Sequence, residues 1–327
     1  MILGGDIGGT HTRLALFDDD GRRLADHPER EYPSRDHASL DVIVRCFVDE
    51  THARPGAACF GIAGPVKDGR SVATNLPWIV DAAELGRQLG ARAWVINDLE
   101  ATAWGLGALG PDELAELSPG VPDAIGNIAV IAAGTGLGEA GLYWDGRQHH
   151  PFATEGGHAS FAPEDELEVE LLRWLQGRFH EHVSWERVLS GPGLVSLYEF
   201  LRDTGRGEEP AWLADAMRAG DPGAAITAAA LDGKSPLAAL TLDRFVALYG
   251  CEAANLGLKV MSSGGVYVGG GIAPRILPKL REGSFRDRFL DKGRMQHVLE
   301  SMPVRVVLND QAGLLGAGRC AAVRARS

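Results

Sequence analysis

The sequence predicts an α/β protein made of two similar domains that face each other across a cleft. Two observations support this prediction. Short apolar segments alternate along the chain with segments of helical period, which is typical of α/β proteins. In addition, one pattern occurs twice, as "ILGGDIGGTHTRLALFDDDGRR" at residues 2–23 and as "IAVIAAGTGLGEAGLYWDGRQ" at residues 128–148. The length of 327 residues is suitable for two domains.

Both copies of the pattern predict a β-turn-β-turn-β unit whose first turn is rich in glycine. Each copy begins with a short apolar run and reaches a Gly/Thr turn, "GGT" at 8–10 and "GTG" at 134–136. Each continues as an alternating segment that ends at an Asp-Gly pair, at 20–21 and 145–146. Asp-Gly pairs favour tight hairpin turns. Two similar domains would bring the two Gly/Thr turns to the same cleft.

The segments between and after the two copies supply the remaining elements. We expect a buried strand from Ala57 to Ala63, and a strand at 92–96 followed by a helix for which Asp98 is a suitable N-cap. Apolar spacing, with acids in the first turn, predicts a helix within 163–179. Further on, "GGVYVGGGIAPRILPKL" predicts a strand, a glycine turn and a helix, and "DQAGLLGAGRCAAVRA" predicts a closing helix of small residues.

The turn-rich segment "LGPDELAELSPGVPD" marks the expected domain boundary. We therefore assign residues 1–110, joined by the C-terminal helix at about 311–327, to a smaller N-terminal α/β domain. Residues 111–310 form a larger C-terminal α/β domain in this interpretation.

The composition excludes several classes of partner. Hydrophobic residues make up 45% and charged residues 23% of the chain, as in globular proteins. The net charge of −12 lacks the basic surplus of nucleic-acid binders. No signal peptide is visible and no apolar run reaches the roughly 18 residues of a membrane span, so we expect a cytoplasmic protein without membrane contact. Four scattered cysteines favour buried thiols over a zinc site or disulfides.

The two Gly/Thr turns are candidate phosphate sites, because backbone N–H groups in such turns can surround an anion. A dinucleotide-binding turn would be followed by a helix, whereas "TRLALF" predicts a strand. Gly233-Lys234-Ser235 ends like a P-loop but lacks the first glycine of that motif. Asp6 lies inside the first turn, where a carboxylate would repel a phosphate. It is either a partner for a cation or part of a local Asx turn.

Polar residues in three further segments have both a functional and a structural interpretation. Asn97 and Asp98 follow an apolar strand, where an acid is either a catalytic base or a helix cap. Glu155 and His158 flank two glycines, in a loop that either binds ligand hydroxyls or only connects two elements. Glu186 precedes a Gly-Pro-Gly turn, and alone it would be a surface glutamate.

Together, these segments resemble the bacterial glucokinases of the hexokinase–actin–Hsp70 superfamily. The matching segments occur in order from residue 4 to about 274, and they are "GGDIGGTHTRLALF", "FGIAGPV", "TNLPW", "INDLEATAWG", "AAGTGLGEA", "EGGHASFAP", "ERVLSGPGL" and "GGVYVGGGIAP". The resemblance implies duplicated ribonuclease H-like domains, as in actin-like ATPases, on either side of the cleft. It also implies transfer of the ATP γ-phosphoryl group to the 6-hydroxyl of glucose, and a homodimer.

The resemblance assigns roles to individual residues. It implies that the nucleotide phosphates and adenosine contact Gly5, Asp6, Ile7, Gly8, Gly9, Thr10, Gly134, Thr135, Gly136, Gly270 and Gly271. The sugar ligands would be Asn97, Asp98, Glu155, His158 and Glu186. Asp98 would be the catalytic base, and Asp6 would hold Mg²⁺ through water. Related ROK sugar kinases carry a cysteine-rich zinc motif after the histidine, but "HASFAPEDELEVELLRW" has no cysteine, so the zinc-free type is expected.

Alternatives remain at this stage. One is a kinase of another hexose or of an amino sugar on the same fold. Another is a non-catalytic nucleotide switch of the actin/Hsp70 type. The polar residues Asn97, Asp98, Glu155, His158 and Glu186 argue against it, because such a switch has no use for groups that recognise hydroxyls. A sugar-sensing repressor would usually add a helix-turn-helix. The preferred sugar and the use of polyphosphate or ADP as donor are open.

Overall fold

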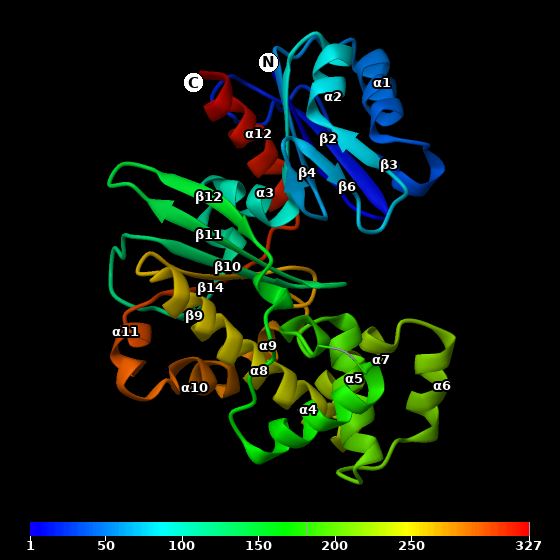
Figure 1. Cartoon of the computed structure of the whole chain (residues 1–327), viewed down its shortest axis with the longest axis vertical. Helices are drawn as coiled ribbons and strands as arrows, with labels where there is room; N and C mark the ends of the chain where they lie inside the picture. The colour runs from blue at the N-terminus through cyan, green and yellow to red at the C-terminus, as the bar shows by residue number, and fades with distance from the viewer. Residues whose placement is uncertain (181, 327) are drawn as a thin grey trace. The chain divides into compact units, whose positions relative to one another are not determined.

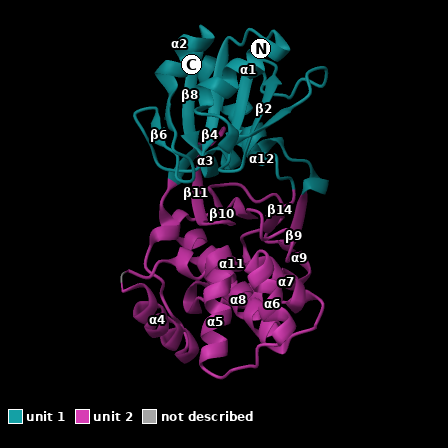
Figure 2. Ribbon diagram, turned by 90° about the vertical axis from the view of Figure 1, so that its right-hand side faces the viewer, with its two compact units in different colours: residues 1–113, 151–153, 309–327 teal, residues 114–150, 154–308 magenta. Residues whose placement is uncertain are grey.

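A computed structural model describes residues 1–180 and 182–326 of the chain (Figure 1). The chain divides into two compact units, coloured separately in Figure 2. Unit 1 contains Met1–Glu113, Pro151–Ala153 and the C-terminal segment from Asn309. Unit 2 contains Leu114–His150 and Thr154–Leu308.

Unit 1 is built on a five-stranded sheet with the strand order β3-β2-β1-β4-β8. Strands β1, β2 and β3 pair antiparallel, while β1, β4 and β8 run parallel to one another. The strands are β1 (Ile2–Ile7), β2 (His11–Phe17), β3 (Arg30–Pro33), β4 (Ala57–Ile62) and β8 (Arg92–Asn97). A small antiparallel sheet is formed by β5 (Val66–Lys67), β6 (Arg70–Val72) and β7 (Ile79–Asp81).

Helices cover both faces of this sheet (Figure 1). Helices α1 (Leu40–Thr51) and α2 (Ala82–Leu89) share one apolar core with the sheet, and α3 (Asp98–Gly105) and α12 (Ala312–Arg326) share the other. The alternation of strand side chains explains the division, because Leu3 belongs to the first core and Ile2 to the second. Short 3-10 turns occupy η1 (Ser34–Asp36), η2 (Leu106–Ala108) and η3 (Pro111–Glu113).

The small residues of α12 allow its backbone to approach its neighbours closely. A Cβ atom at Gly316 would overlap the carbonyl oxygen of Ala101 in α3. A Cβ atom at Gly318 would lie 2.5 Å from the ring of Phe17 in β2. The run of small residues that predicts a closing helix therefore reflects tight packing of α12 against α3 and the sheet.

The second sheet has six strands in the order β12-β11-β10-β13-β14-β9. Strand β10 pairs antiparallel with β11 and parallel with β13, just as β1 pairs antiparallel with β2 and parallel with β4. This correspondence confirms the predicted repeat. The strands are β9 (Leu114–Ser118), β10 (Ile128–Ala133), β11 (Leu137–Trp144), β12 (His149–Thr154), β13 (Gly265–Gly269) and β14 (Val304–Val307).

Unit 2 carries most of the helices, and the longest of them, α8 (Pro236–Val260), contributes many of its side chains to the apolar core. Tyr249 of α8 connects the helix to the sheet, because the N–H of Ala133 donates to the Tyr249 hydroxyl at 3.0 Å. The other helices and turns are η4 (Gly156–His158), α4 (Glu166–Phe179), η5 (Trp185–Arg187), α5 (Gly191–Asp203), α6 (Ala211–Ala219), α7 (Pro222–Leu231), α9 (Leu277–Leu280), α10 (Ser284–Leu290), η6 (Gly293–Met295) and α11 (Gln296–Glu300).

All four cysteines carry free thiols. Within residues 1–180 and 182–326, none of the helices is both long and apolar enough to cross a lipid bilayer.

Candidate active site

Asp6 occupies the next-to-last position of β1, opposite Arg13 of β2. Its carboxyl group lies beside the first turn of α12, because a Cβ atom at Gly313 would be 3.4 Å from the Asp6 Cγ and 3.5 Å from Oδ1. The N-terminal end of a helix carries a partial positive charge, which favours an acid at this place. Asp6 is therefore built into the sheet and faces the start of a helix.

The electrostatic surroundings of Asp6 disfavour its negative charge. Burial, followed by the charge of Asp98, raises the pKa of Asp6 to about 6, against the opposing effect of Arg13. Arg13 is itself engaged by two acids, donating to Glu31 and to Asp310, at 3.0 Å each. A cation bound beside Asp6 would relieve the repulsion between the acids in this region.

The turn after β1 is held in place by Ser34. The N–H of Gly8 donates to the His11 carbonyl at 2.9 Å, and the Ser34 hydroxyl donates to the Gly8 carbonyl at 2.8 Å. The N–H of Ser34 donates to the Thr10 carbonyl at 2.8 Å. Gly9 must remain small, because a Cβ atom there would be 2.8 Å from the Cβ of Asn75. The turn is thus well ordered while Thr10 itself is exposed.

The structure corrects the predicted cap of α3. Asn97, not Asp98, is the N-cap, because its Oδ1 accepts from the N–H groups of Leu99 at 2.9 Å and Glu100 at 3.3 Å. Asn97 keeps an extended backbone, from which its side chain reaches these amides. Its Nδ2 donates to the Gly64 carbonyl at 3.2 Å. Asp98 is the first residue of the helix, and its Oδ1 accepts from Leu99 at 3.0 Å.

In unit 2, the turn between β10 and β11 contacts Glu186. The Oε2 atom of Glu186 accepts from the N–H of Leu137 at 3.0 Å, and a Cβ atom at Gly136 would lie 2.5 Å from that same oxygen. Gly134 donates to the Gly136 carbonyl and accepts from the N–H of Gly191, each at 2.8 Å. Glu186 is therefore not a free surface residue but is held against the glycine turn by this hydrogen bond.

The loop that contains Glu155 and His158 lies against the start of β11. A Cβ atom at Gly157 would overlap the Leu137 carbonyl, and one at Gly156 would overlap the Glu139 carboxylate. The two glycines are thus required for close approach. Glu155 and His158 point to solvent, with 60% of each side chain exposed and 3.9 Å between Oε2 and Nε2. These two side chains are available to a ligand.

Gly270 and Gly271 follow β13. Gly270 has φ +81°, in the left-handed region, and a Cβ atom there would overlap the backbone of Ala133 at the end of β10. Gly271 has open space around the position of a Cβ atom. The backbone geometry therefore requires a glycine at position 270, whereas position 271 has room for a side chain.

Comparison with known proteins places the chain in a family. The family model described as Glucokinase matches residues 3–324. The chain belongs to the glucokinase family. It is 41% identical to a glucokinase of Nostoc punctiforme over 337 residues, which cover 98% of this chain and 99% of the relative. The crystal structure of a glucokinase from an Antarctic psychrotroph is 33% identical, covers 98% of both chains and has a TM-score of 0.84.

The likeness extends to more distant members in fold alone. The crystal structure of glucokinase from Balamuthia mandrillaris in complex with glucose covers 98% of this chain and 93% of that chain, with 23% identity and a TM-score of 0.81. The structural neighbours of this chain share the actin-like ATPase fold, which confirms the predicted fold class.

Sequence reasoning missed several residues of this glucokinase-family chain that adjoin the candidate site. Arg13 and Asp310 influence the charge of Asp6, and Glu139 lies under the loop of Glu155 and His158. Arg13 and Glu139 both lie in strands next to a Gly/Thr turn, and that position is the signal that could have identified them.

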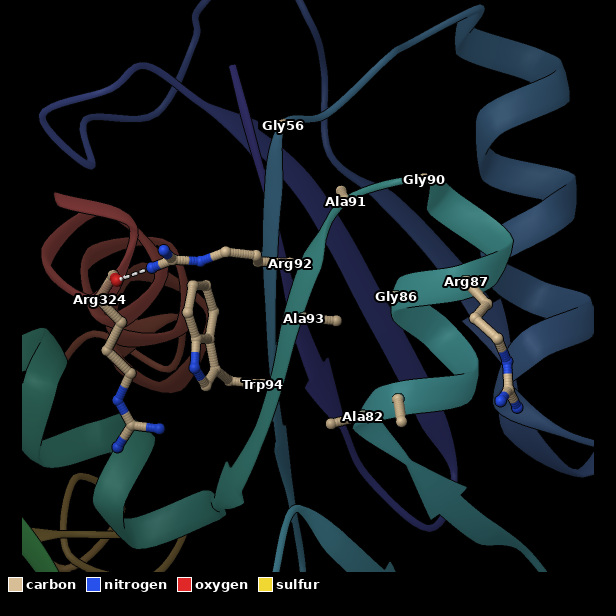
Figure 3. Close-up of a pocket in the computed structure, with 11 residues that line it drawn as sticks. Gly56, Ala82, Gly86, Arg87, Gly90, Ala91, Arg92, Ala93, Trp94 and Arg324 are labelled. Atoms are coloured by element: carbon tan, nitrogen blue, oxygen red, sulfur yellow. Dashed lines mark hydrogen bonds between the residues drawn. The ribbon is translucent and has the colours of Figure 1, made fainter. Parts of the chain in front are cut away.

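An open pocket of unit 1 contains none of the predicted residues (Figure 3). It has a volume of about 1020 Å³ and is lined by α2 and by β8, at the edge of the sheet. Arg92 lies with its guanidinium carbon 5.1 Å from the centre of the Trp94 ring and donates to the carbonyl of Arg324. The Arg324 guanidinium donates to Glu100 at 3.0 Å. Because these arginines are already engaged, we do not assign the reaction to this pocket.

Proposed function

We propose that this chain is an ATP-dependent glucokinase, which transfers the γ-phosphoryl group of ATP to the 6-hydroxyl of glucose and yields ADP and glucose 6-phosphate for glycolysis. Membership of the glucokinase family over residues 3–324 supports this activity. The observation that carries the mechanism is the place of Asp98, at the carboxyl end of β8, on the first turn of α3 and within the electrostatic influence of Asp6. Ligands of open α/β sheets bind at such strand ends.

Asp98 acts as the general base in this proposal. Its carboxylate accepts the proton of the 6-hydroxyl as that oxygen attacks the γ-phosphorus, and the bond from phosphorus to the ADP oxygen breaks. Phosphoryl transfer depends mainly on positioning and on neutralisation of charge. Asp98 is held by the first turn of α3, which is in turn fixed by the Asn97 cap.

The sugar is bound in this proposal by Asn97, Asp98, Glu155, His158 and Glu186. Asn97 can contribute a donor only, because both acceptor positions of its amide oxygen are occupied by Leu99 and Glu100. The exposed Glu155 and His158 can accept from or donate to ring hydroxyls. A sugar that lacks one of these hydroxyls would leave its partner side chain without that hydrogen bond.

The phosphates contact the two glycine turns and the ends of the strands before them in this proposal. The end of β1 and the turn after it contribute Gly5, Asp6, Ile7, Gly8, Gly9 and Thr10, the second turn contributes Gly134, Thr135 and Gly136, and Gly270 and Gly271 lie by the adenosine. The hydrogen bonds of Ser34 to both ends of the first turn support a preorganised anion site.

The residues around Asp6 fit a divalent cation. Burial and a second acid raise the pKa of Asp6, so that a positive charge would stabilise its ionised form. Magnesium prefers oxygen ligands and usually retains several waters, and when bound it neutralises phosphate charge. We therefore propose that Asp6 holds Mg²⁺ through a water molecule.

Three finer assignments belong to the same proposal. The chain is of the zinc-free, non-ROK type, since no cysteine occurs between Cys59 and Cys251. The protein acts in the cytoplasm, and it forms a homodimer, as the family resemblance implies. Residues 1–110 with about 311–327 form the smaller domain, and residues 111–310 the larger one.

A panel of sugars and phosphoryl donors tests the function. ADP release should be fastest with glucose and ATP, and slower with mannose, fructose, N-acetylglucosamine or N-acetylmannosamine. A higher kcat/KM for one of these sugars would favour the alternative of another hexose or amino-sugar kinase. ATP binding without sugar-dependent ADP release would favour the non-catalytic nucleotide switch. Polyphosphate and ADP, offered as donors in place of ATP, should give no sugar phosphate.

A further inference from the structure

Two glutamates with no role in the proposed reaction lie buried together in unit 2. Glu139 belongs to β11 and is 2% exposed, and Glu252 belongs to α8 and is 0% exposed. Their side chains are within hydrogen-bonding reach of each other. Two buried carboxyl groups in contact cannot both carry a charge without a large cost, so they share a proton.

The hydrogen bonds show which of the two carries the proton. Glu252 accepts from Asn255 at 2.8 Å and from Lys259 at 3.5 Å, which stabilises its ionised form. Glu139 Oε1 is buried and has no donor among the described residues. Burial, followed by the charge of Glu252, raises the pKa of Glu139 well above its ordinary value. Glu139 is therefore the protonated member, and it donates to Glu252.

The pair supports the loop of Glu155 and His158. A Cβ atom at Gly156 would overlap Glu139 Oε2, so the carboxyl group lies directly beneath the loop backbone. The Thr154 hydroxyl donates to the Glu139 carbonyl at 3.0 Å and accepts from the N–H of Gly156 at 3.1 Å. The side chain and the backbone of Glu139 thus both determine where this loop lies.

Few other titratable groups face the pair. From α8, the charge of Lys259 lowers the pKa of Glu139. Tyr249, also from α8, has a hydroxyl whose pKa is raised mainly by burial and to a smaller extent by the charge of Glu139. From the neighbouring strand β10, the apolar Ile131 is the residue paired with Glu139. From the loop, Glu155 and His158 point to solvent.

We propose that Glu139 and Glu252 are positioning residues for sugar binding, in which one shared proton holds the loop of Glu155 and His158 in the geometry that binds the sugar. Loss of this proton at alkaline pH places two negative charges beneath Gly156, shifts the loop and weakens glucose binding. The inference rests on the proposed glucokinase function and on the assignment of Glu155 and His158 as sugar ligands.

The pH dependence of glucose KM and kcat tests the proposal. In the wild type, glucose KM should rise about tenfold in the alkaline range while kcat changes less than twofold. The reason is that the displaced loop loses contacts that stabilise the bound sugar and the transition state equally. In Glu139→Gln the amide still donates to Glu252 but cannot ionise, so KM should stay constant across the range. An alkaline rise in KM that is the same in Glu139→Gln and wild type would overturn the proposal.

Lys259→Met provides a variant with little risk to folding, because 56% of the Lys259 side chain is exposed. Since Lys259 lowers the pKa of Glu139, its removal should move the rise in KM to higher pH. A rise at the same pH as in the wild type would contradict the coupling. If the pair had a purely structural role, Lys259→Met would change the stability of the protein but would not shift the pH at which glucose KM rises.

Hydrogen exchange separates this inference from the proposed function. Amides of the segment 154–158, corrected for intrinsic rates, should lose protection at alkaline pH in the wild type and keep it in Glu139→Gln, both without sugar. If no sugar is phosphorylated but this difference is present, the proposed function fails and the shared-proton support of the loop remains. Equal protection in the two proteins at every pH would overturn the inference.

Discussion

The carboxylate of Glu186 accepts a hydrogen bond from the backbone N–H of Leu137 through Oε2 at 3.0 Å. The bond ties a proposed sugar ligand to the first residue after the proposed phosphate turn Gly134–Gly136. Because a hydrogen bond to a charged group contributes roughly 1.5–3 kcal/mol, the two parts of the site should respond together to mutation.

Gly136→Ala should impair the site through Glu186. The new Cβ atom would lie 2.5 Å from Glu186 Oε2, so the carboxylate must move and its bond to Leu137 is lost. We expect glucose KM to rise about tenfold or more, with a lower kcat. Steady-state kinetics measure both effects. Gly177→Ala in α4 is the matched control, because its Cβ meets nothing within 4 Å, and it should leave both constants unchanged. Wild-type kinetics in Gly136→Ala would contradict this role of Glu186.

Asp98→Asn should abolish most of the turnover while glucose binding stays measurable. The amide oxygen can still accept from Leu99, so the start of α3 is preserved, but the proton acceptor is lost. We expect kcat to fall by at least the roughly 10²–10⁴-fold contribution of a general base. Asp81→Asn serves as control, because Asp81 caps α2 through Ala83 and Glu84, and asparagine caps equally well. Near wild-type turnover in Asp98→Asn would exclude the base assignment.

Asp6→Asn should stabilise the protein without ligand, and more so at pH 7.5 than at pH 5. The folded state raises the pKa of Asp6 from 3.8 to about 6, so its contribution to stability is present at low pH and is lost as the pH rises through about 6. Removing the charge should then increase the free energy of unfolding by roughly 1–3 kcal/mol at pH 7.5. Denaturant titrations at both pH values measure this. A gain that does not depend on pH would contradict the assigned surroundings of Asp6.

The same Asp6→Asn variant tests the proposed role in magnesium binding. We expect the Mg²⁺ concentration for half-maximal activity, at constant ATP, to rise about tenfold, which corresponds to a loss of roughly 1.4 kcal/mol. Asp310→Asn is the comparison, because Asp310 is exposed and affects Asp6 less than Asp98 does. The structure places Asp6 in β1 and not in an Asx turn, so an unchanged Mg²⁺ dependence in Asp6→Asn would leave Asp6 without the proposed role in magnesium binding.

Much of the fold could be predicted because its signals are local. The repeated hairpins, the apolar spacing within 163–179 and the small-residue helix are all encoded in short segments, and the structure has β1–β2, β10–β11, α4 and α12 there. The cap of α3 was misassigned by one residue, because Asn97 and Asp98 are both good caps and only the backbone at Asn97 decides between them.

The buried pair could not be predicted because its partners are distant in sequence. Glu139 lies in a segment expected to alternate between apolar and polar residues, where an acid indicates a solvent-facing position. Strand β11 is instead buried along most of its length. The partner Glu252 belongs to helix α8, which is distant in sequence. The effect of Asp310 on Asp6 is likewise long-range, since β1 and the segment before α12 meet only in the folded chain.

Direct observation of the reaction product tests the central claim most directly. With glucose, ATP and Mg²⁺, a phosphorus NMR time course should show one sugar phosphate, with the phosphorus coupled to the C6 protons of glucose. It should form at the same rate as ADP, and at least roughly 10²-fold more slowly with Asp98→Asn. ADP formation without a sugar phosphate, phosphorylation at another hydroxyl, or no reaction with glucose would contradict the account.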